Sequence, residues 1–165
     1  MKRVIFVRHG QAEEGTPGMS DFERSLTHKG KDVSRQMAVK MREKIKDPGT
    51  LITSPAFRAY ETAIIFAGVN GIPYDKVILR NILYLNIDSK SLMDIISFVS
   101  EDADTITLFG HNPTFTDLAN YFCTEPVESL PKSGIVSLVF DTRTWSGLKP
   151  DSARSELYLK PKKTI

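Results

Sequence analysis

The sequence predicts an α/β fold of three layers, in which helices cover both faces of a mostly parallel central sheet. Short apolar runs alternate with longer segments of helical period, which is the pattern of parallel strands joined by crossover helices. The last two apolar runs have no helix between them and predict an antiparallel C-terminal edge. We expect residues 1–165 to form a single domain, because a chain of this length can bury one substantial core.

Simple patterns predict the first strand and the first helix. Residues 4–7 are consecutively apolar, as in a strand that is buried on both faces. A helix is predicted over residues 27–46, with Thr27 as its N-cap, because apolar side chains recur there at a spacing of four. The Asp-Pro-Gly sequence at residues 47–49 ends it.

The second strand leads directly into a pair of residues that start helices. Residues 51–53 form the strand, and Ser54 as N-cap with Pro55 at the first helical position should open a helix that ends at Gly68. The later elements are a strand at 76–79, a helix capped by Asp88 with an apolar face of Leu92, Ile95, Ile96 and Val99, a strand at 105–109, a helix over 113–122, and strands at 135–140 and 155–159.

The composition excludes several classes of partner. The 22 Lys and Arg against 20 Asp and Glu give a net charge of +2, which is too balanced to indicate nucleic acid. No apolar stretch is long enough for a membrane span, and the run after the basic start is too short for a signal peptide.

Cys123 is the only cysteine, so we expect a buried thiol and a cytoplasmic location, where thiols stay reduced. No sequence feature indicates the oligomeric state.

Histidine and arginine side chains follow three of the predicted strands. Arg8 and His9 come after the first strand, and His111 comes after the strand at 105–109. Arg58 falls in the first turn of the helix after the second strand. The carboxyl ends of parallel strands meet at one edge of a sheet, so these side chains should lie together. Guanidinium groups match phosphate oxygens, and imidazole can be nucleophile, acid or base, so the set predicts a phosphoryl-binding site.

The remaining histidine and the cysteine do not indicate a metal site. His9, His28, His111 and Cys123 lack the ligand spacings of zinc-binding motifs. His28 stands at a predicted helix start outside any motif, and we assign it a structural role. We expect neither a metal nor another cofactor.

Three motifs stand in order along nearly the whole chain. They are Arg8-His9-Gly10, then Ser54-Pro55 followed by Arg58, Ala59 and Thr62, and then Gly110-His111. Together they resemble the histidine phosphatase superfamily, which also contains the cofactor-dependent phosphoglycerate mutases. Within it the chain is most similar to the SixA phosphohistidine phosphatases, in its short length and in the patterns Asp21, Arg24, Leu26-Thr27, Gly30 and Gly110-His111-Asn112-Pro113.

The resemblance implies a role for each strand-end residue. His9 is the implied nucleophile, which accepts the phosphoryl group. The chemistry agrees, because two nearby guanidinium groups lower an imidazole pKa and keep the ring neutral, and because Arg and His donors can stabilise a transferring phosphoryl group without metal. The implied phosphate-binding residues are Arg8, Gly10, Arg58, His111 and Asn112. Three of them, Arg8, Arg58 and His111, are also candidate catalytic residues.

A general acid is the part of the site with the weakest candidate. Many relatives have a glutamate after the third strand, where this chain has only Asp88 as a carboxylate. Asp88 is a candidate acid, although its place before a predicted helix favours an N-cap role. Glu13, Glu14 and Asp21 in the first loop are further candidates, which we expect to be solvated. SixA-type proteins also lack the usual acid, and a phosphohistidine P–N bond breaks readily once solvent has protonated its imidazole.

These features predict a metal-independent phosphatase that forms a phospho-His9 intermediate and acts on protein phosphohistidine. The predicted connections are short, with no inserted domain to enclose a small molecule. The alternative is a phosphomonoesterase for a small metabolite such as a sugar phosphate. A third function is a non-catalytic phosphate-binding module, which would not need His9. The expected partner is a phosphorylated protein or a small phosphate ester, and neither nucleic acid nor a membrane.

Overall fold

Six strands form one mixed sheet in the computed structural model, which describes residues 1–163. The strands are β1 (Lys2–Arg8), β2 (Thr50–Thr53), β3 (Ile78–Leu79), β4 (Thr105–Gly110), β5 (Ile135–Phe140) and β6 (Ala153–Leu159). The helices are α1 (His28–Lys44), α2 (Phe57–Val69), α3 (Ser89–Ile96) and α4 (Thr114–Phe122), and two short 3₁₀ turns contribute to the site, η1 (Asp21–Glu23) and η3 (Asn81–Tyr84). No helix within residues 1–163 is long and apolar enough to cross a membrane.

The sheet is parallel at its centre and antiparallel at one edge, which confirms the prediction. Its order is β3-β2-β4-β1-β5-β6, and β5 and β6 are the antiparallel strands. Arg8 lies opposite Gly110 in the parallel pair of β1 and β4, so His9 and His111 leave neighbouring strands at the same level. The backbone N–H of His9 donates to the carbonyl of Gly110 at 3.0 Å. The strand register therefore sets the two histidines side by side.

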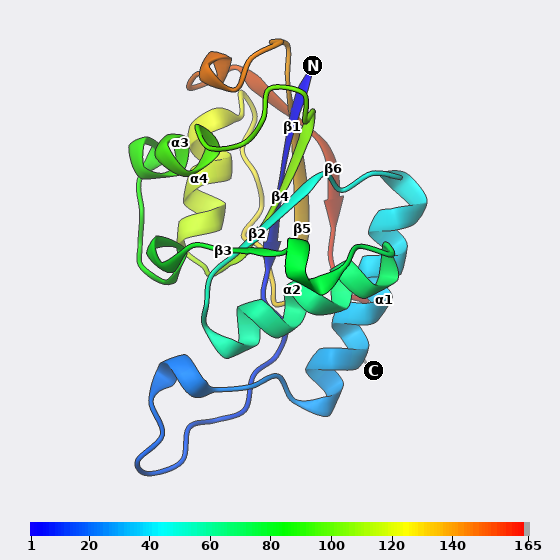
Figure 1. Cartoon of the computed structure of the whole chain (residues 1–165), viewed down its shortest axis with the longest axis vertical. Coiled ribbons are helices and arrows are strands. Elements are labelled where there is room, and N and C mark those ends of the chain that lie inside the picture. Colours follow the sequence, from blue (N-terminus) through cyan, green and yellow to red (C-terminus); the bar gives the residue numbers. More distant parts are fainter. Residues whose placement is uncertain (164–165) are drawn as a thin grey trace.

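Two apolar cores, one on each face of the sheet, give the protein the predicted three layers (Figure 1). Val4 and Phe6 of β1 belong to the core that α3 and α4 cover. Ile5 and Val7 belong to the core that α1 and α2 cover. Successive side chains of a strand face opposite sides, so one unbroken apolar run serves both cores.

Two of the predicted helix caps are confirmed. Thr27 Oγ1 accepts the N–H of Gly30 at 2.9 Å at the start of α1. Asp88 Oδ1 accepts the N–H of Ser91 at 3.0 Å at the start of α3. Each bond satisfies a backbone donor that the first turn of a helix leaves without an intrahelical partner.

The predicted start of α2 is wrong. The helix begins at Phe57 and not at Pro55, because Ser54 Oγ accepts the N–H of Ala56 at 3.3 Å in a bend before the helix. Arg58 still lies in the first turn, as predicted. The later start leaves the Ser54 hydroxyl at the edge of the sheet, where it contacts the site.

The first helix approaches the end of β1 so closely that two glycines are required. A Cβ atom on Gly30 would lie 2.1 Å from the carbonyl oxygen of Gln11, and one on Gly10 would lie 2.5 Å from Ser34 Oγ. Both distances are well inside van der Waals contact, so a side chain at Gly30 would displace α1 from the strand end, and one at Gly10 would force the Ser34 side chain to move. This packing holds the segment after His9 against α1.

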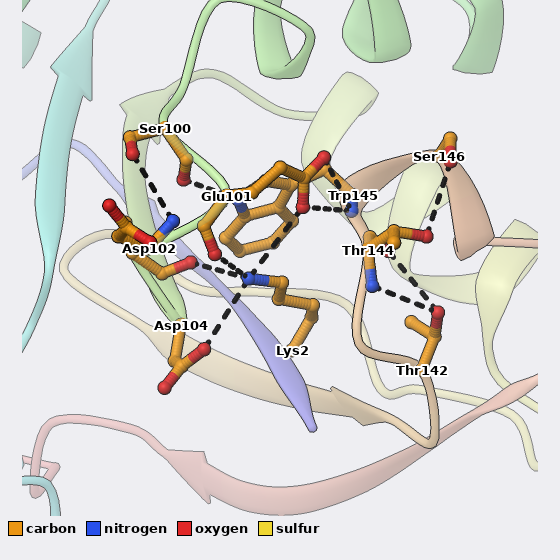
Figure 2. A network of polar contacts seen from close by, with 10 residues as sticks. Lys2, Ser100, Glu101, Asp102, Asp104, Thr142, Thr144, Trp145 and Ser146 are labelled. Atoms are coloured by element: carbon orange, nitrogen blue, oxygen red, sulfur yellow. Dashed lines mark hydrogen bonds and ion pairs between the residues drawn. The ribbon is translucent and has the colours of Figure 1, made fainter.

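A buried charge, Lys2, lies at the amino end of β1, whereas the histidines follow the carboxyl ends of β1 and β4. Figure 2 shows the polar contacts of Lys2. Its Nζ donates to the backbone carbonyls of Glu101 at 2.7 Å and Ala103 at 2.8 Å. The ammonium also lies 3.4 Å from the Asp104 carboxylate and 4.8 Å from the centroid of the Trp145 ring. Lys2 therefore joins the loop before β4 and the turn around Trp145 to the first strand.

Replacing Lys2 with alanine is expected to lower the free energy of unfolding by about 2 to 3 kcal/mol, because two backbone carbonyls lose their donor. Urea unfolding of Lys2→Ala, beside Lys46→Ala at an exposed position, measures the difference. Equal unfolding midpoints for the two variants would contradict this account of Lys2.

Candidate active site

The structure brings the strand-end residues together. His9 follows β1, His111 follows β4, and the centroids of their rings are 5.2 Å apart. The charges of Arg8 and Arg58 both act on His9. His9 is 7% exposed and Arg58 is 8% exposed, so both residues are buried. Two imidazoles and two guanidinium groups thus meet at the carboxyl edge of the sheet, where the long loop before α1 also lies (Figure 1).

His9 has one defined tautomer when it is neutral. Its Nδ1 lies 2.7 Å from the carbonyl oxygen of Gly10, and this partner can only accept a hydrogen bond. Nδ1 therefore carries the proton, and the lone pair is on Nε2. The backbone of the Arg8-His9-Gly10 motif itself selects the tautomer in which Nε2 can act as a nucleophile.

Both imidazoles are neutral at physiological pH. Burial is the main reason that the pKa of His9 falls to about 3, and the positive charges of His111, Arg58 and Arg8 add to it. The bond to the Gly10 carbonyl opposes this shift. Burial, followed by the charge of Arg58, lowers the pKa of His111 to about 4. A neutral His9 retains the electron pair that an attack on phosphorus requires.

These pKa values predict how kcat/KM depends on pH, because kcat/KM reports the ionisation of the free enzyme. His9 is a nucleophile only above its pKa of about 3. After correction for ionisation of the substrate phosphate, kcat/KM should therefore be flat between about pH 5 and 8 and should fall in more acidic solution. Initial rates with an aryl phosphate measure the profile. An enzyme ionisation near pH 6.5, the ordinary histidine value, would contradict a buried neutral His9.

Arg8 and Asn112 bind the same backbone carbonyl. Arg8 Nη1 donates to the Leu130 oxygen at 3.0 Å, and Asn112 Nδ2 donates to it at 2.9 Å. Asn112 Oδ1 accepts from Thr116 Oγ1 at 3.0 Å, so both ends of its amide are engaged. Arg8 Nε is buried and has no hydrogen-bond partner within residues 1–163. Asn112 therefore supports the loop that holds Arg8, and its predicted contact with phosphate stays a prediction.

Thr62 connects the segment after His9 to the helix that carries Arg58. Its Oγ1 donates to the carbonyl of Arg58 at 2.7 Å and accepts the N–H of Gly10 at 3.1 Å. The Gly10 N–H, a predicted phosphate donor, is thus bound to Thr62 in this structure. The two bonds fix the position of α2 relative to the Arg8-His9-Gly10 motif.

His111 is held by two residues that the sequence did not assign to it. Ser54 Oγ lies 2.8 Å from His111 Nε2. The ring of Tyr84 packs edge-on against the His111 ring, with centroids 5.7 Å apart and an interplanar angle of 90°. Ser54 and Tyr84 come from separate connections of the chain, so no local pattern could reveal these contacts.

Asp21 is exposed, as expected, but its carboxylate also has three partners that the sequence did not reveal. Its carboxylate binds Arg58 Nη2 at 2.9 Å, Arg24 Nη1 at 2.9 Å and the Tyr84 hydroxyl at 2.6 Å. The Tyr84 hydroxyl, with the two arginines, holds the pKa of the Asp21 carboxyl well below its usual range. Asp21 is therefore ionised at physiological pH and has no proton to give to a leaving group. The spacing of Asp21 and Arg24, part of the family-like pattern, is the sequence signal that marks this cluster.

The other carboxylates considered as proton donors, Asp88, Glu13 and Glu14, are exposed as well. Asp88 caps α3, and the N–H of Ser91 lowers the pKa of its carboxyl. Glu13 and Glu14 are exposed in the first loop, as expected. The structure thus shows the cap role of Asp88, and a role as general acid stays a prediction.

Within residues 1–163 no group of three or more His, Cys, Asp or Glu side chains is arranged to hold a metal ion. Cys123 is a buried free thiol, as expected, and burial raises its pKa. His28 is exposed at the start of α1.

Solved structures with this fold include phosphatases of two kinds. The protein histidine phosphatase SixA complexed with tungstate matches with a TM-score of 0.79 and 23% identity, over 96% of this chain and 97% of that one. A protein from Agrobacterium tumefaciens, provisionally described as a phosphohistidine phosphatase SixA, matches with 0.78 and 22%, over 98% and 99%. A mycobacterial glucosyl-3-phosphoglycerate phosphatase matches with 0.71 and 12%, over 95% and 98%. At these identities the likeness shows a shared fold.

The family is shown by the sequence itself. No curated protein matches the chain. The model of the histidine phosphatase superfamily (branch 1) matches residues 4–133, a range that contains all three strand-end motifs. With the fold and the motifs in agreement, this chain belongs to the histidine phosphatase superfamily.

Proposed function

We propose that the protein is a metal-independent phosphatase that passes a phosphoryl group to His9 and then to water, and that its substrate is phosphohistidine in another protein. Membership of the superfamily supports the phosphatase class. The location expected for a chain with one buried free thiol, a reducing cytosol, is part of the proposal.

One observation carries the proposal, namely the neutral and oriented imidazole of His9 beside two guanidinium groups. The Gly10 carbonyl sets the tautomer, and burial keeps the ring unprotonated. When Nε2 is phosphorylated the ring becomes cationic, and the bond from Nδ1–H to that carbonyl then stabilises the new charge. A protein that only binds phosphate has no need of this arrangement.

The reaction would proceed in two displacements. In the first, His9 Nε2 attacks phosphorus, a P–N bond forms, and the bond to the leaving group breaks. Arg8, Arg58 and His111 would donate to the phosphoryl oxygens as charge spreads over them. In the second, water attacks phospho-His9, the electron pair of the P–N bond returns to Nε2, and orthophosphate leaves with the proton lost to solvent.

The preference for phosphohistidine rests on the state of the carboxylates that could have served as proton donors. Asp21 is ionised, and Asp88 is an exposed helix cap. An alkoxide leaving group needs a positioned acid, whereas an imidazole leaving group can be protonated by solvent on its other nitrogen before it departs. The site therefore favours a P–N bond over the P–O bond of an alkyl phosphate.

A small-molecule phosphomonoesterase is the second candidate, because a glucosyl-3-phosphoglycerate phosphatase shares the fold. Initial rates with a phosphohistidine protein, aryl phosphates and sugar phosphates, each with and without a chelator, compare the candidates. We expect phosphohistidine and aryl phosphates to react far faster than alkyl phosphates, and chelator to change nothing. A sugar phosphate as best substrate would select the second candidate, and phosphate binding without any turnover would indicate a binding module.

Replacing Asp88 with asparagine is expected to change turnover by less than about twofold, since an asparagine side chain also caps a helix. If Asp88 were the general acid, the variant would lose about a hundredfold or more, mainly with poor leaving groups. Rates of Asp88→Asn and wild type across phosphoramidate, aryl and alkyl substrates decide the matter. A leaving-group dependence that is flat in the wild type and steep in the variant would overturn the preference for phosphohistidine.

A further inference from the structure

The long loop before α1 contributes a carboxylate, that of Asp21, which binds Arg58, the arginine proposed to hold phosphate. Arg58 donates from Nη1 to the backbone carbonyl of Asp21 at 2.8 Å and from Nη2 to its Oδ2 at 2.9 Å. One residue thus binds both terminal nitrogens of the guanidinium, which limits rotation about the last bonds of the side chain. These two bonds use two of the five N–H donors of Arg58, so three remain for a ligand.

Asp21 is also the charge that compensates a buried arginine. The Arg58 side chain is 9% exposed, whereas that of Asp21 is 53% exposed. A guanidinium in this position needs a partner, because an uncompensated buried charge is strongly unfavourable. Asp21 therefore holds Arg58 beside His9 when no phosphate is present.

The same carboxylate reaches the second histidine through Tyr84. The Tyr84 hydroxyl donates to Asp21 Oδ2 at 2.6 Å, and the Tyr84 ring packs edge-on against His111. Phe22, the next residue in η1, packs against Tyr84 with ring centroids 5.3 Å apart. The loop thus contacts Arg58 directly and contacts His111 through Tyr84.

Two other roles for Asp21 can be distinguished from a positioning role. A proton donor would have to be protonated, and this carboxylate accepts hydrogen bonds from two arginines and a tyrosine. A plug that competes with phosphate for Arg58 would slow the enzyme, so its removal would raise kcat/KM. Removal of a positioning residue would instead lower kcat/KM.

We propose that Asp21 is a positioning residue that holds Arg58, and through Tyr84 the His111 ring, in the geometry that receives the phosphoryl group. This inference rests on the proposed function of the same site. It assigns to the first loop a part in catalysis that involves no contact with the reacting atoms.

Asp21→Asn keeps the shape of the side chain and removes its charge. We expect kcat/KM for an aryl phosphate to fall about 10- to 100-fold, the range for a lost orienting partner or a small misplacement of a reacting group. Tyr84→Phe, which keeps the ring on His111, should fall by a smaller factor and serves as the milder variant. Asp32→Asn is the matched control, because Asp32 forms an exposed ion pair with Arg35 on α1.

A double-mutant cycle with Arg58→Ala tests whether Asp21 acts through Arg58. If it does, Asp21→Asn should lower kcat/KM little further once Arg58 is absent. Additive losses would overturn the inference, as would an unchanged or raised kcat/KM in both Asp21→Asn and Tyr84→Phe. Urea unfolding of each variant identifies any loss that comes from unfolding alone.

Orthophosphate binding, followed by calorimetry, gives a readout that needs no turnover. We expect Asp21→Asn to bind orthophosphate about tenfold more weakly than wild type or Asp32→Asn. A wild type that binds orthophosphate in this Asp21-dependent way but turns over no phosphate compound would refute the proposed function and leave the positioning role intact. Normal turnover with the same affinity and rate in Asp21→Asn would refute the positioning role alone.

Discussion

Replacing His9 with alanine is expected to abolish turnover, with a loss of roughly 10⁴-fold or more, since no other group can accept the phosphoryl from the same position. The fold should survive, because His9 lies at a strand end and, among residues 1–163, its ring hydrogen-bonds only to the carbonyl of its neighbour Gly10. Initial rates with an aryl phosphate and urea unfolding of the same preparation measure both effects.

His28→Ala is the matched control for this experiment, since it removes an exposed histidine outside the motifs. It should retain wild-type rates. A His9→Ala variant that retains full activity would remove His9 from the mechanism, whatever its effect on stability.

Replacing Arg58 with lysine is expected to lower kcat/KM by about 10² to 10³, although the positive charge is kept. A lysine ammonium is a point charge and cannot bind two oxygens in the planar, bidentate manner of a guanidinium. It also cannot reproduce the paired bonds from Nη1 and Nη2 to Asp21. Steady-state kinetics of Arg58→Lys give the size of the effect.

Arg35→Lys provides the comparison, because Arg35 is exposed on α1, where it pairs with Asp32. This variant should behave as wild type. If Arg58→Lys and Arg35→Lys were equally active, Arg58 would not hold the phosphoryl group.

Much of the fold could be predicted because its signals are local. The strand at β1 is an unbroken apolar run, and the caps at Thr27 and Asp88 are short side chains placed just before helical patterns. The gathering of His9 and His111 also follows from a general rule, since parallel strands end at one edge of a sheet. Sequence order and strand polarity are enough to bring these residues together.

The contacts that tune the site could not be predicted, because they join connections distant in the chain. Asp21 and Tyr84 are 63 positions apart, and they meet only when the first loop folds over η3. Ser54 reads as a helix cap in sequence, yet a later helix start turns it toward His111. The sequence gives no sign that Lys2 is buried, yet two carbonyls of a loop about a hundred residues away accept hydrogen bonds from its ammonium group.

Trapping the covalent intermediate tests the central claim most directly. Wild-type protein mixed with a labelled aryl phosphate and quenched within milliseconds in base should carry one labelled phosphoryl group on the peptide containing His9. This label should be stable in base and lost in acid, as a phosphoramidate is, and His28→Ala should carry it as well. Turnover at the wild-type rate with no label on His9, or with label on a serine or on His111, would contradict phosphoryl transfer through His9.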